Sequence, residues 1–210
     1  MIQGIKNLLF DFGGVLVDLD RERCIRAFSQ LGFDLRPCLG DYAQNGIFSQ
    51  LERGQLTLPQ FCEALRSQSG LSTITDEQII AAWRQFLLTI PDERLDSLIR
   101  LRERFPLYLL SNTNEVHWEM AQNDLFLYKG NTVDDFFKQI FLSYELGIEK
   151  PSPAIFQAVL DGTGICAEET LFIDDAEANC EAARALGFKA YCPKTPGCWI
   201  DYLEKEESEA

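Results

Sequence analysis

Five short runs rich in apolar residues recur along the chain, with helical patterns between them. They are NLLFDF (7–12), LYLLSN (107–112), QIFLSY (139–144), TLFIDD (170–175) and KAYC (189–192). Strands that are apolar almost throughout and alternate with helices are typical of a parallel sheet covered on both faces. The sequence therefore predicts an α/β fold with a doubly wound, Rossmann-like parallel-sheet core.

The interval between the first and second runs is too long for one crossover helix. From about residue 20 to 90 it holds four helical patterns and no strand pattern. Thr57 with Gln60, and Thr75 with Gln78, have the spacing of capping boxes at helix starts. We therefore expect an inserted four-helix cap, and the predicted division is 1–18 and 91–210 for the core and 19–90 for the cap.

Composition narrows the classes of partner. The 210 residues include 19 Lys plus Arg against 33 Asp plus Glu, a net charge of -14, which argues against nucleic acid as a ligand. There is no apolar run of roughly 18 residues and no N-terminal signal pattern, so we expect no membrane association and a cytoplasmic protein. Seven scattered cysteines and one histidine favour neither a zinc site nor disulfides. A monomer is the default expectation.

Polar side chains stand where four of the runs end. Asp11 ends the first predicted strand, Ser111 ends the second, Lys150 lies in the loop after the third, and Asp174 and Asp175 end the fourth. Ligands of open parallel sheets bind at the carboxyl ends of the strands. We therefore expect these side chains to meet in one crevice.

The chemistry of this set favours a metal-assisted phosphate site. Three converging carboxylates repel one another unless a cation neutralises them, and oxygen ligands without His or Cys suit Mg2+. A Ser hydroxyl, a Lys ammonium and the N–H groups of the Gly13-Gly14 turn would supply donors for an anion. Asp11 would then face the phosphorus atom.

Four segments of the chain carry a family resemblance. DFGGVLVD, LLSNTN, GIEKPSPAIF and LFIDDAEANCEAARALG resemble the four motifs of the haloacid dehalogenase-like hydrolase superfamily, in the branch whose helical cap follows the first motif. The likeness spans nearly the whole chain. Within that branch the chain looks most like the bacterial subgroup active on glucose 1-phosphate, and less like the phosphatase domain of soluble epoxide hydrolases.

The resemblance implies a role for each motif residue. Asp11 would be the nucleophile that forms an aspartyl-phosphate. Lys150 would pair with Asp11 and stabilise the transferring group. The remaining assignments are Ser111, Asn112 and the Gly14 turn for the phosphoryl oxygens, and Asp11, the Gly13 carbonyl, Asp174 and Asp175 for Mg2+.

Gly13 leaves open how the leaving group is protonated. Most phosphatases of the superfamily carry Asp at this second site, and acid–base help of this kind is worth roughly a hundred- to ten-thousand-fold. A haloacid dehalogenase needs no such acid, but it uses no metal and lacks a carboxylate pair such as Asp174 and Asp175. A phosphoglucomutase-like transferase depends on the missing Asp.

Two explanations of Gly13 fit the rest of the sequence better. A phosphatase tolerates the loss of the acid at position 13 if the leaving group departs readily, as an anomeric sugar oxygen does. It also tolerates this loss if Asp18, Asp20, His117 or a bound water replaces the acid. Alternatively, the chain is a catalytically weak protein that binds a phosphorylated ligand or a partner. We expect the first: a magnesium-dependent phosphatase acting on a small phosphorylated metabolite, plausibly a sugar phosphate such as glucose 1-phosphate.

Overall fold

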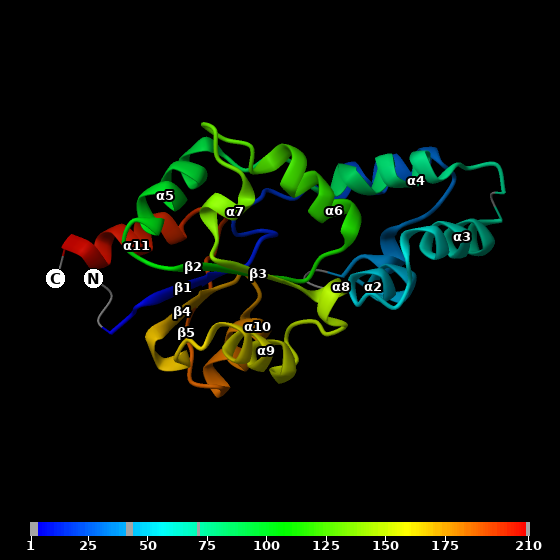
Figure 1. Ribbon diagram of the computed structural model, residues 1–210. Coiled ribbons are helices and arrows are strands. Elements are labelled where there is room, and N and C mark those ends of the chain that lie inside the picture. The colour runs from blue at the N-terminus through cyan, green and yellow to red at the C-terminus, as the bar shows by residue number, and fades with distance from the viewer. Residues whose placement is uncertain (1–3, 41–43, 71, 209–210) are drawn as a thin grey trace.

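The computed structural model describes residues 4–40, 44–70 and 72–208. Its five strands form one parallel sheet in the order β3-β2-β1-β4-β5, with helices on both sides (Figure 1). This confirms the α/β, Rossmann-like fold that the apolar runs predict. The strands are β1 (Asn7–Phe10), β2 (Leu107–Ser111), β3 (Gln139–Leu142), β4 (Thr170–Ile173) and β5 (Lys189–Tyr191).

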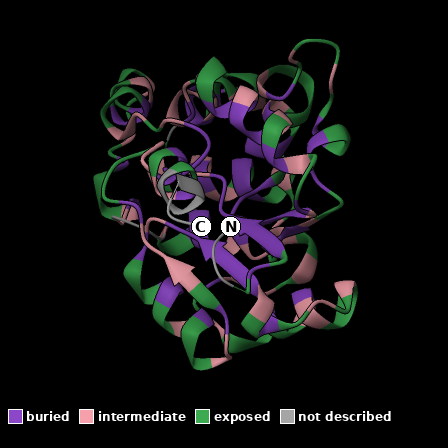
Figure 2. Ribbon diagram, turned by 90° about the vertical axis from the view of Figure 1, so that its left-hand side faces the viewer, coloured by how far each residue is buried: buried purple, intermediate pink, exposed green. Residues whose placement is uncertain are grey.

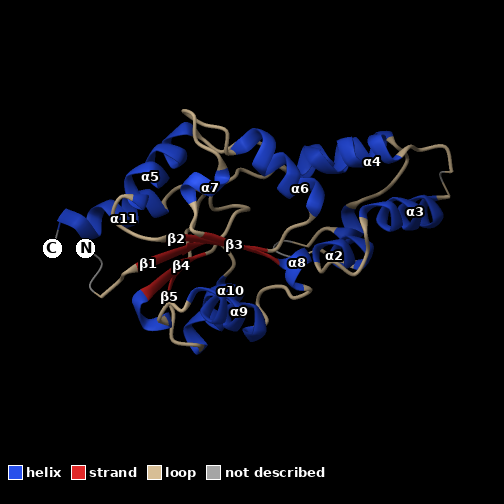
Figure 3. Cartoon of the chain, viewed as in Figure 1, coloured by secondary structure: helices blue, strands red, loops and turns tan. Residues whose placement is uncertain are grey.

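Helices fill most of the remaining described chain (Figure 3), and none of them combines the length and apolar character needed to cross a bilayer. Four short helical turns accompany them: η1 (Arg36–Cys38), η2 (Arg84–Phe86), η3 (Ala121–Leu125) and η4 (Ala167–Glu169). The α-helices are α1 (Arg21–Gln30), α2 (Gly46–Glu52), α3 (Leu58–Ser69), α4 (Asp76–Trp83), α5 (Asp92–Arg102), α6 (Glu115–Met120), α7 (Val133–Phe136), α8 (Ser143–Leu146), α9 (Pro153–Thr163), α10 (Glu177–Ala185) and α11 (Trp199–Ser208).

The sheet is buried because both of its faces are covered (Figure 2). Leu8 and Phe10 of β1 pack in one apolar cluster with α5, α7 and α11, whereas Leu9 packs in a second cluster with α9 and α10. Successive strand residues point to opposite faces, so every residue of a central strand needs an apolar partner. This explains the unbroken apolar runs in the sequence.

The helices from α1 to η2 form a helical lobe beside the sheet (Figure 1). Their apolar cluster centres on aromatic side chains, and Phe48 lies 4.9 Å from Phe61 and 4.8 Å from Trp83 between ring centroids. Aromatic residues at helical spacing, such as Phe48 and Trp83, thus pack inside the lobe. We propose that this lobe, with residues 19 and 20 and the chain up to 90, acts as a cap over the core.

Local signals in the lobe are partly confirmed. The capping boxes at Thr57 and Thr75 are both present and begin α3 and α4. Residues 38–54 carry the second of the four helical patterns, but the α-helix there begins only at Gly46. Residues 41–43 lie outside the described part of the chain. The fourth helix, α4, ends at Trp83, before its sequence pattern ends. Farther along the chain, Leu87 pairs with Leu19 in the connection that enters the lobe.

The two connections between core and lobe run side by side. Leu19 and Leu87 form an antiparallel bridge, the Asp18 N–H donates to Thr89 O at 3.0 Å, and the Leu88 N–H donates to Asp18 O at 2.9 Å. A paired connection holds the lobe above the carboxyl ends of the strands.

Candidate active site

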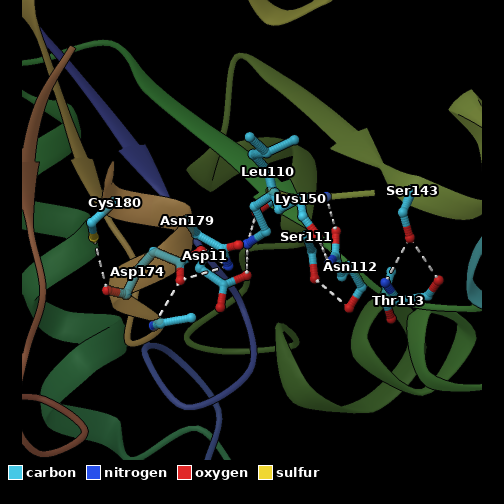
Figure 4. A network of polar contacts seen from close by, with 11 residues as sticks. Asp11, Leu110, Ser111, Asn112, Thr113, Ser143, Lys150, Asp174, Asn179 and Cys180 are labelled. Carbon is cyan, nitrogen blue, oxygen red and sulfur yellow. Dashed lines mark hydrogen bonds and ion pairs between the residues drawn. The ribbon is translucent and has the colours of Figure 1, made fainter. Parts of the chain in front are cut away.

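The strand ends bring the expected polar residues together. Phe10 lies level with Leu109 of β2 and Ile173 of β4, so the residues that follow these strands share one edge of the sheet. Asp11 and Asp174 follow their strands directly, and the Lys150 side chain reaches between them (Figure 4). The parallel register therefore builds a cluster from segments far apart in the sequence.

Lys150 is the centre of this cluster. Its Nζ lies 2.6 Å from Asp11 Oδ1, 2.6 Å from Asp174 Oδ2 and 3.0 Å from Leu110 O. The three ammonium protons thus have three acceptors, and the side chain is buried. Its pKa is raised above the ordinary value: burial acts to lower it, but the charges of the two carboxylates and their hydrogen bonds outweigh that effect.

Asn112 fixes the backbone that carries this lysine. Its Nδ2 donates to Lys150 O at 2.9 Å, and its Oδ1 accepts from the Lys150 N–H at 2.8 Å. The resemblance assigns Asn112 to the phosphoryl oxygens, but these two bonds engage its side-chain amide. We therefore propose that this side chain positions Lys150. Ser111, buried at the end of β2, lines the pocket beside it.

The two carboxylates after β4 have different surroundings. Both oxygens of Asp174 are bonded, Oδ1 to the Ala176 N–H and to Asn179 Nδ2, each at 2.9 Å, and Oδ2 to Lys150. Asp175, by contrast, lines the pocket. Asp11, Asp174 and Asp175 each offer a carboxylate oxygen within 4.8 Å of the others, a grouping that suits a metal ion. Asp175 is the more accessible ligand of the pair.

One lysine cannot neutralise three carboxylates. Burial, with the charges of Asp174 and Asp175, raises the pKa of Asp11 to about 8, although Lys150 opposes this rise. Burial and the charge of Asp174 raise the pKa of Asp175 to about 6. The site therefore carries an excess of negative charge, and a further cation is needed to hold Asp11 ionised at neutral pH.

The glycine turn after Asp11 differs from the expectation in one respect. The Gly14 N–H, expected to be a phosphate donor, donates instead to Val17 O at 2.9 Å. Gly14 has φ +74°, and a Cβ there would lie 2.3 Å from Asp175 Oδ2. Gly14 is thus required for the close approach of Asp175. The Gly13 carbonyl accepts no hydrogen bond from the described residues and lines the pocket.

The helical lobe contributes residues to the same pocket. The cavity measures about 90 Å³, and five lobe or hinge residues line its wall: Leu19, Gln44, Glu52, Phe86 and Leu87. Phe86 packs against the apolar cluster of the lobe and also faces the site. None of the five belongs to a motif, because each reaches the cavity through the docking of the lobe on the core.

His117 lines this pocket but is held as a neutral structural residue. Its ring stacks on Trp83 at 4.5 Å and Phe86 at 5.8 Å between centroids. Nε2 lies 3.0 Å from Trp83 O, and Nδ1 lies 3.3 Å from Asn114 Nδ2, which assigns the proton to Nε2. Burial lowers its pKa to about 4. Both ring nitrogens are engaged, so His117 is a poor proton donor to a substrate.

This environment predicts acid destabilisation through His117. Between the unfolded value near 6.5 and the folded pKa of about 4, the unfolded chain binds a proton that the folded chain does not. The free energy of unfolding therefore falls as pH drops through this window, by about 3 kcal/mol at the acid end. Urea unfolding at pH 7.5, 6 and 4.5 checks this against His117→Gln. A difference between the two proteins that is constant with pH would contradict it.

Known proteins are similar to this chain in sequence and in fold. The haloacid dehalogenase-like hydrolase family matches residues 5–187. A D-ribitol-5-phosphate phosphatase from Bacteroides thetaiotaomicron is 37% identical over 200 residues, covering 95% of this chain and 97% of the relative. A crystal structure of a HAD family enzyme from the same species, an aspartate-to-alanine mutant in complex with magnesium and inorganic phosphate, has a TM-score of 0.91 and 44% identity over 95% of this chain and 98% of its own.

A further solved structure is similar over its full length. The structure of a predicted HAD-like family hydrolase from Porphyromonas gingivalis has a TM-score of 0.90 at 37% identity, covering 98% of this chain and 99% of the other. The matching family spans residues 5–187, a range that includes Asp11, Lys150 and Asp174. On these grounds, the chain belongs to the haloacid dehalogenase-like hydrolase family.

Proposed function

We propose that this hydrolase is a magnesium-dependent phosphatase acting on a small, open-chain polyol phosphate through an aspartyl-phosphate on Asp11. The observation that carries the proposal is the position of Asp11, with Oδ1 held 2.6 Å from Lys150 Nζ at the wall of the shared pocket. A protein that only binds a phosphorylated ligand needs no such oriented nucleophile. A haloacid dehalogenase would not need the excess of carboxylates.

The described side chains fit each step of phosphoryl transfer. An Asp11 carboxylate oxygen attacks phosphorus while the bond from phosphorus to the leaving oxygen breaks, which gives the aspartyl-phosphate. Lys150 orients Asp11 and offsets charge on the transferring group. The Ser111 hydroxyl, which donates to Asn112 O over a long 3.4 Å, would turn to donate to a phosphoryl oxygen in the same pocket. Water then attacks the same phosphorus, which releases phosphate and restores Asp11.

The donor set fits a magnesium ion. We propose that Asp11, Asp175 and the Gly13 carbonyl hold it directly, and that Asp174, whose oxygens are already bonded, acts through water. Magnesium supplies the positive charge that keeps Asp11 ionised and neutralises the phosphoryl group. The relative crystallised with magnesium and inorganic phosphate supports this assignment.

The substrate class rests on the named relative. A D-ribitol-5-phosphate phosphatase shares 37% identity across nearly the whole chain, which favours an acyclic polyol phosphate. Glucose 1-phosphate, which the first motif suggests by resemblance, stays a prediction. The two differ in the leaving group, because a primary alcohol leaves less readily than an anomeric oxygen.

Phosphate release over a substrate panel tests the function. The panel contains D-ribitol 5-phosphate, glucose 1-phosphate, glucose 6-phosphate, a nucleoside monophosphate and p-nitrophenyl phosphate, each with magnesium and with excess EDTA. We expect turnover only with magnesium, and kcat/KM for D-ribitol 5-phosphate about tenfold or more above that for the sugar phosphates. Turnover at the full rate in EDTA would contradict the metal assignment. No turnover on any substrate would favour a phospho-ligand-binding role.

A further inference from the structure

A polyol phosphate makes the missing acid at Gly13 a chemical problem. The leaving oxygen would be a primary alkoxide, which needs a proton as its bond to phosphorus breaks. Gly13 has no side chain to give one. If the substrate class proposed above is right, another group in the pocket must supply this proton.

The acids suggested by the sequence are already engaged elsewhere. Asp18 forms an ion pair with Arg94 at 2.8 Å, and Asp20 caps α1 by accepting from the Arg23 N–H at 2.7 Å. Neither lies on the wall of the pocket. His117 is neutral and uses both ring nitrogens within the protein. These three side chains are structural.

Glu52, at the end of α2, belongs to the lobe side of the pocket. It is 6% exposed and lines the same cavity as Asp11 and Lys150. A phosphoryl group bound against Asp11 would therefore enter the cavity whose wall Glu52 helps to form. Attacking and leaving oxygens are roughly in line at phosphorus, so the leaving oxygen points away from Asp11 and toward the lobe.

The backbone at Glu52 is anchored to the core. Ser143 Oγ donates to Glu52 O at 2.6 Å and accepts from the Thr113 N–H at 2.9 Å, two residues beyond Ser111. α2 approaches α8 so closely that a Cβ at Gly54 would lie 2.1 Å from Tyr144 O. The end of α2 is therefore fixed relative to the phosphate-binding loop of the core.

The Glu52 carboxyl has no partner of its own. No described side chain or backbone N–H forms a hydrogen bond or ion pair with it, and the nearby Arg53 is 3.9 Å from Glu149 instead. Burial, with the charge of Glu149, raises the pKa of Glu52 to about 8. The carboxyl therefore carries a proton at neutral pH. The other titratable groups on the pocket wall are Asp11, Asp175, Lys150 and His117.

We propose that Glu52 is the leaving-group acid of this enzyme. As the bond from phosphorus to the substrate oxygen breaks, its electron pair stays on that oxygen, which takes the Glu52 proton and departs as an alcohol. Glu52 is then a carboxylate. It accepts a proton from the water that attacks the aspartyl-phosphate, and phosphate, free Asp11 and protonated Glu52 are restored. The cap thus supplies the group that Gly13 lacks.

The test compares substrates whose leaving groups differ in their need for a proton. The leaving group of D-ribitol 5-phosphate is an alkoxide, whereas that of p-nitrophenyl phosphate is a stable phenolate. Glu52→Gln should lower kcat/KM on D-ribitol 5-phosphate about 100-fold or more, and less than about fivefold on p-nitrophenyl phosphate. Glu52→Asp, which keeps the acid on a shorter arm, should retain more activity on the polyol phosphate than Glu52→Gln.

Controls separate this role from a structural one. Glu63 is exposed on α3 and lies away from the pocket, so Glu63→Gln should leave the activity on both substrates unchanged. An equal loss on both substrates in Glu52→Gln and Glu52→Asp would mean that Glu52 only holds the lobe in place, and no loss would also overturn the proposal. If wild-type enzyme hydrolyses neither substrate, the proposed function itself fails, a result distinct from either.

Discussion

Asp11→Asn abolishes phosphate release while the protein stays folded. The substitution keeps the shape of the side chain but removes the oxygen nucleophile, so the aspartyl-phosphate cannot form. Loss of a nucleophile that works together with its neighbours is severe, and we expect kcat to fall about 10^4-fold or more. The measurement is steady-state phosphate release with magnesium, on the best substrate of the panel.

Unfolding is not expected to account for this loss. The pKa of Asp11 is raised to about 8, so the folded state disfavours its charge, and a neutral amide there relieves repulsion from Asp174 and Asp175. Without magnesium, Asp11→Asn should therefore be at least as stable as the wild type at pH 8. Asp20→Asn is the matched control, because Asn also caps a helix well and Asp20 lies outside the pocket. Wild-type activity in Asp11→Asn would end the proposal of an aspartyl-phosphate.

The core of the site was predictable because it depends on a local rule. Three of the five apolar runs have a site residue where the strand ends, and parallel strands bring those ends to one edge. Asp11, Ser111 and Asp174 needed no knowledge of distant contacts for their placement. Lys150 lies in a loop, yet the two bonds from Asn112 hold it, and its neighbourhood follows from the same edge of the sheet.

The lobe side of the site could not be read in this way. Glu52 lies in the sequence SQLERG, where a charged residue near a helix end normally faces solvent. It is buried because the end of α2 packs on the core against Ser143 and Tyr144, which lie about ninety residues away in the sequence. His117 shows the converse: its position three residues after the LLSNTN motif suggested chemistry, but stacking against Trp83 and Phe86 makes it structural. Both outcomes depend on how lobe and core pack.

Lys150→Met strongly destabilises the protein as well as inactivating it. Methionine has a similar length but no charge, so Asp11 and Asp174 would be left buried without their shared cation. Removing one partner of a buried ion pair costs about 3–5 kcal/mol of unfolding free energy. Loss of charge stabilisation in the transition state should also lower kcat by about 10²-fold or more in the protein that remains folded.

The pH dependence of this loss identifies its cause. The ammonium group of Lys150 has a raised pKa, so its contribution is fully present at neutral pH and is lost only above the unfolded value of 10.5. The pKa of Asp11 is about 8 beside Lys150, and loss of the ammonium group raises it further, so the wild type ionises Asp11 above pH 8 while the variant resists. The stability deficit of Lys150→Met should therefore be larger at pH 9.5 than at pH 7. Urea unfolding at both values measures this. Lys129→Met, which breaks an exposed 2.6 Å pair with Asp96, should show little change, because solvent screens that pair. A deficit for Lys150→Met that is the same at pH 7 and pH 9.5 would mean that lost packing, rather than unpaired charge, destabilises the variant.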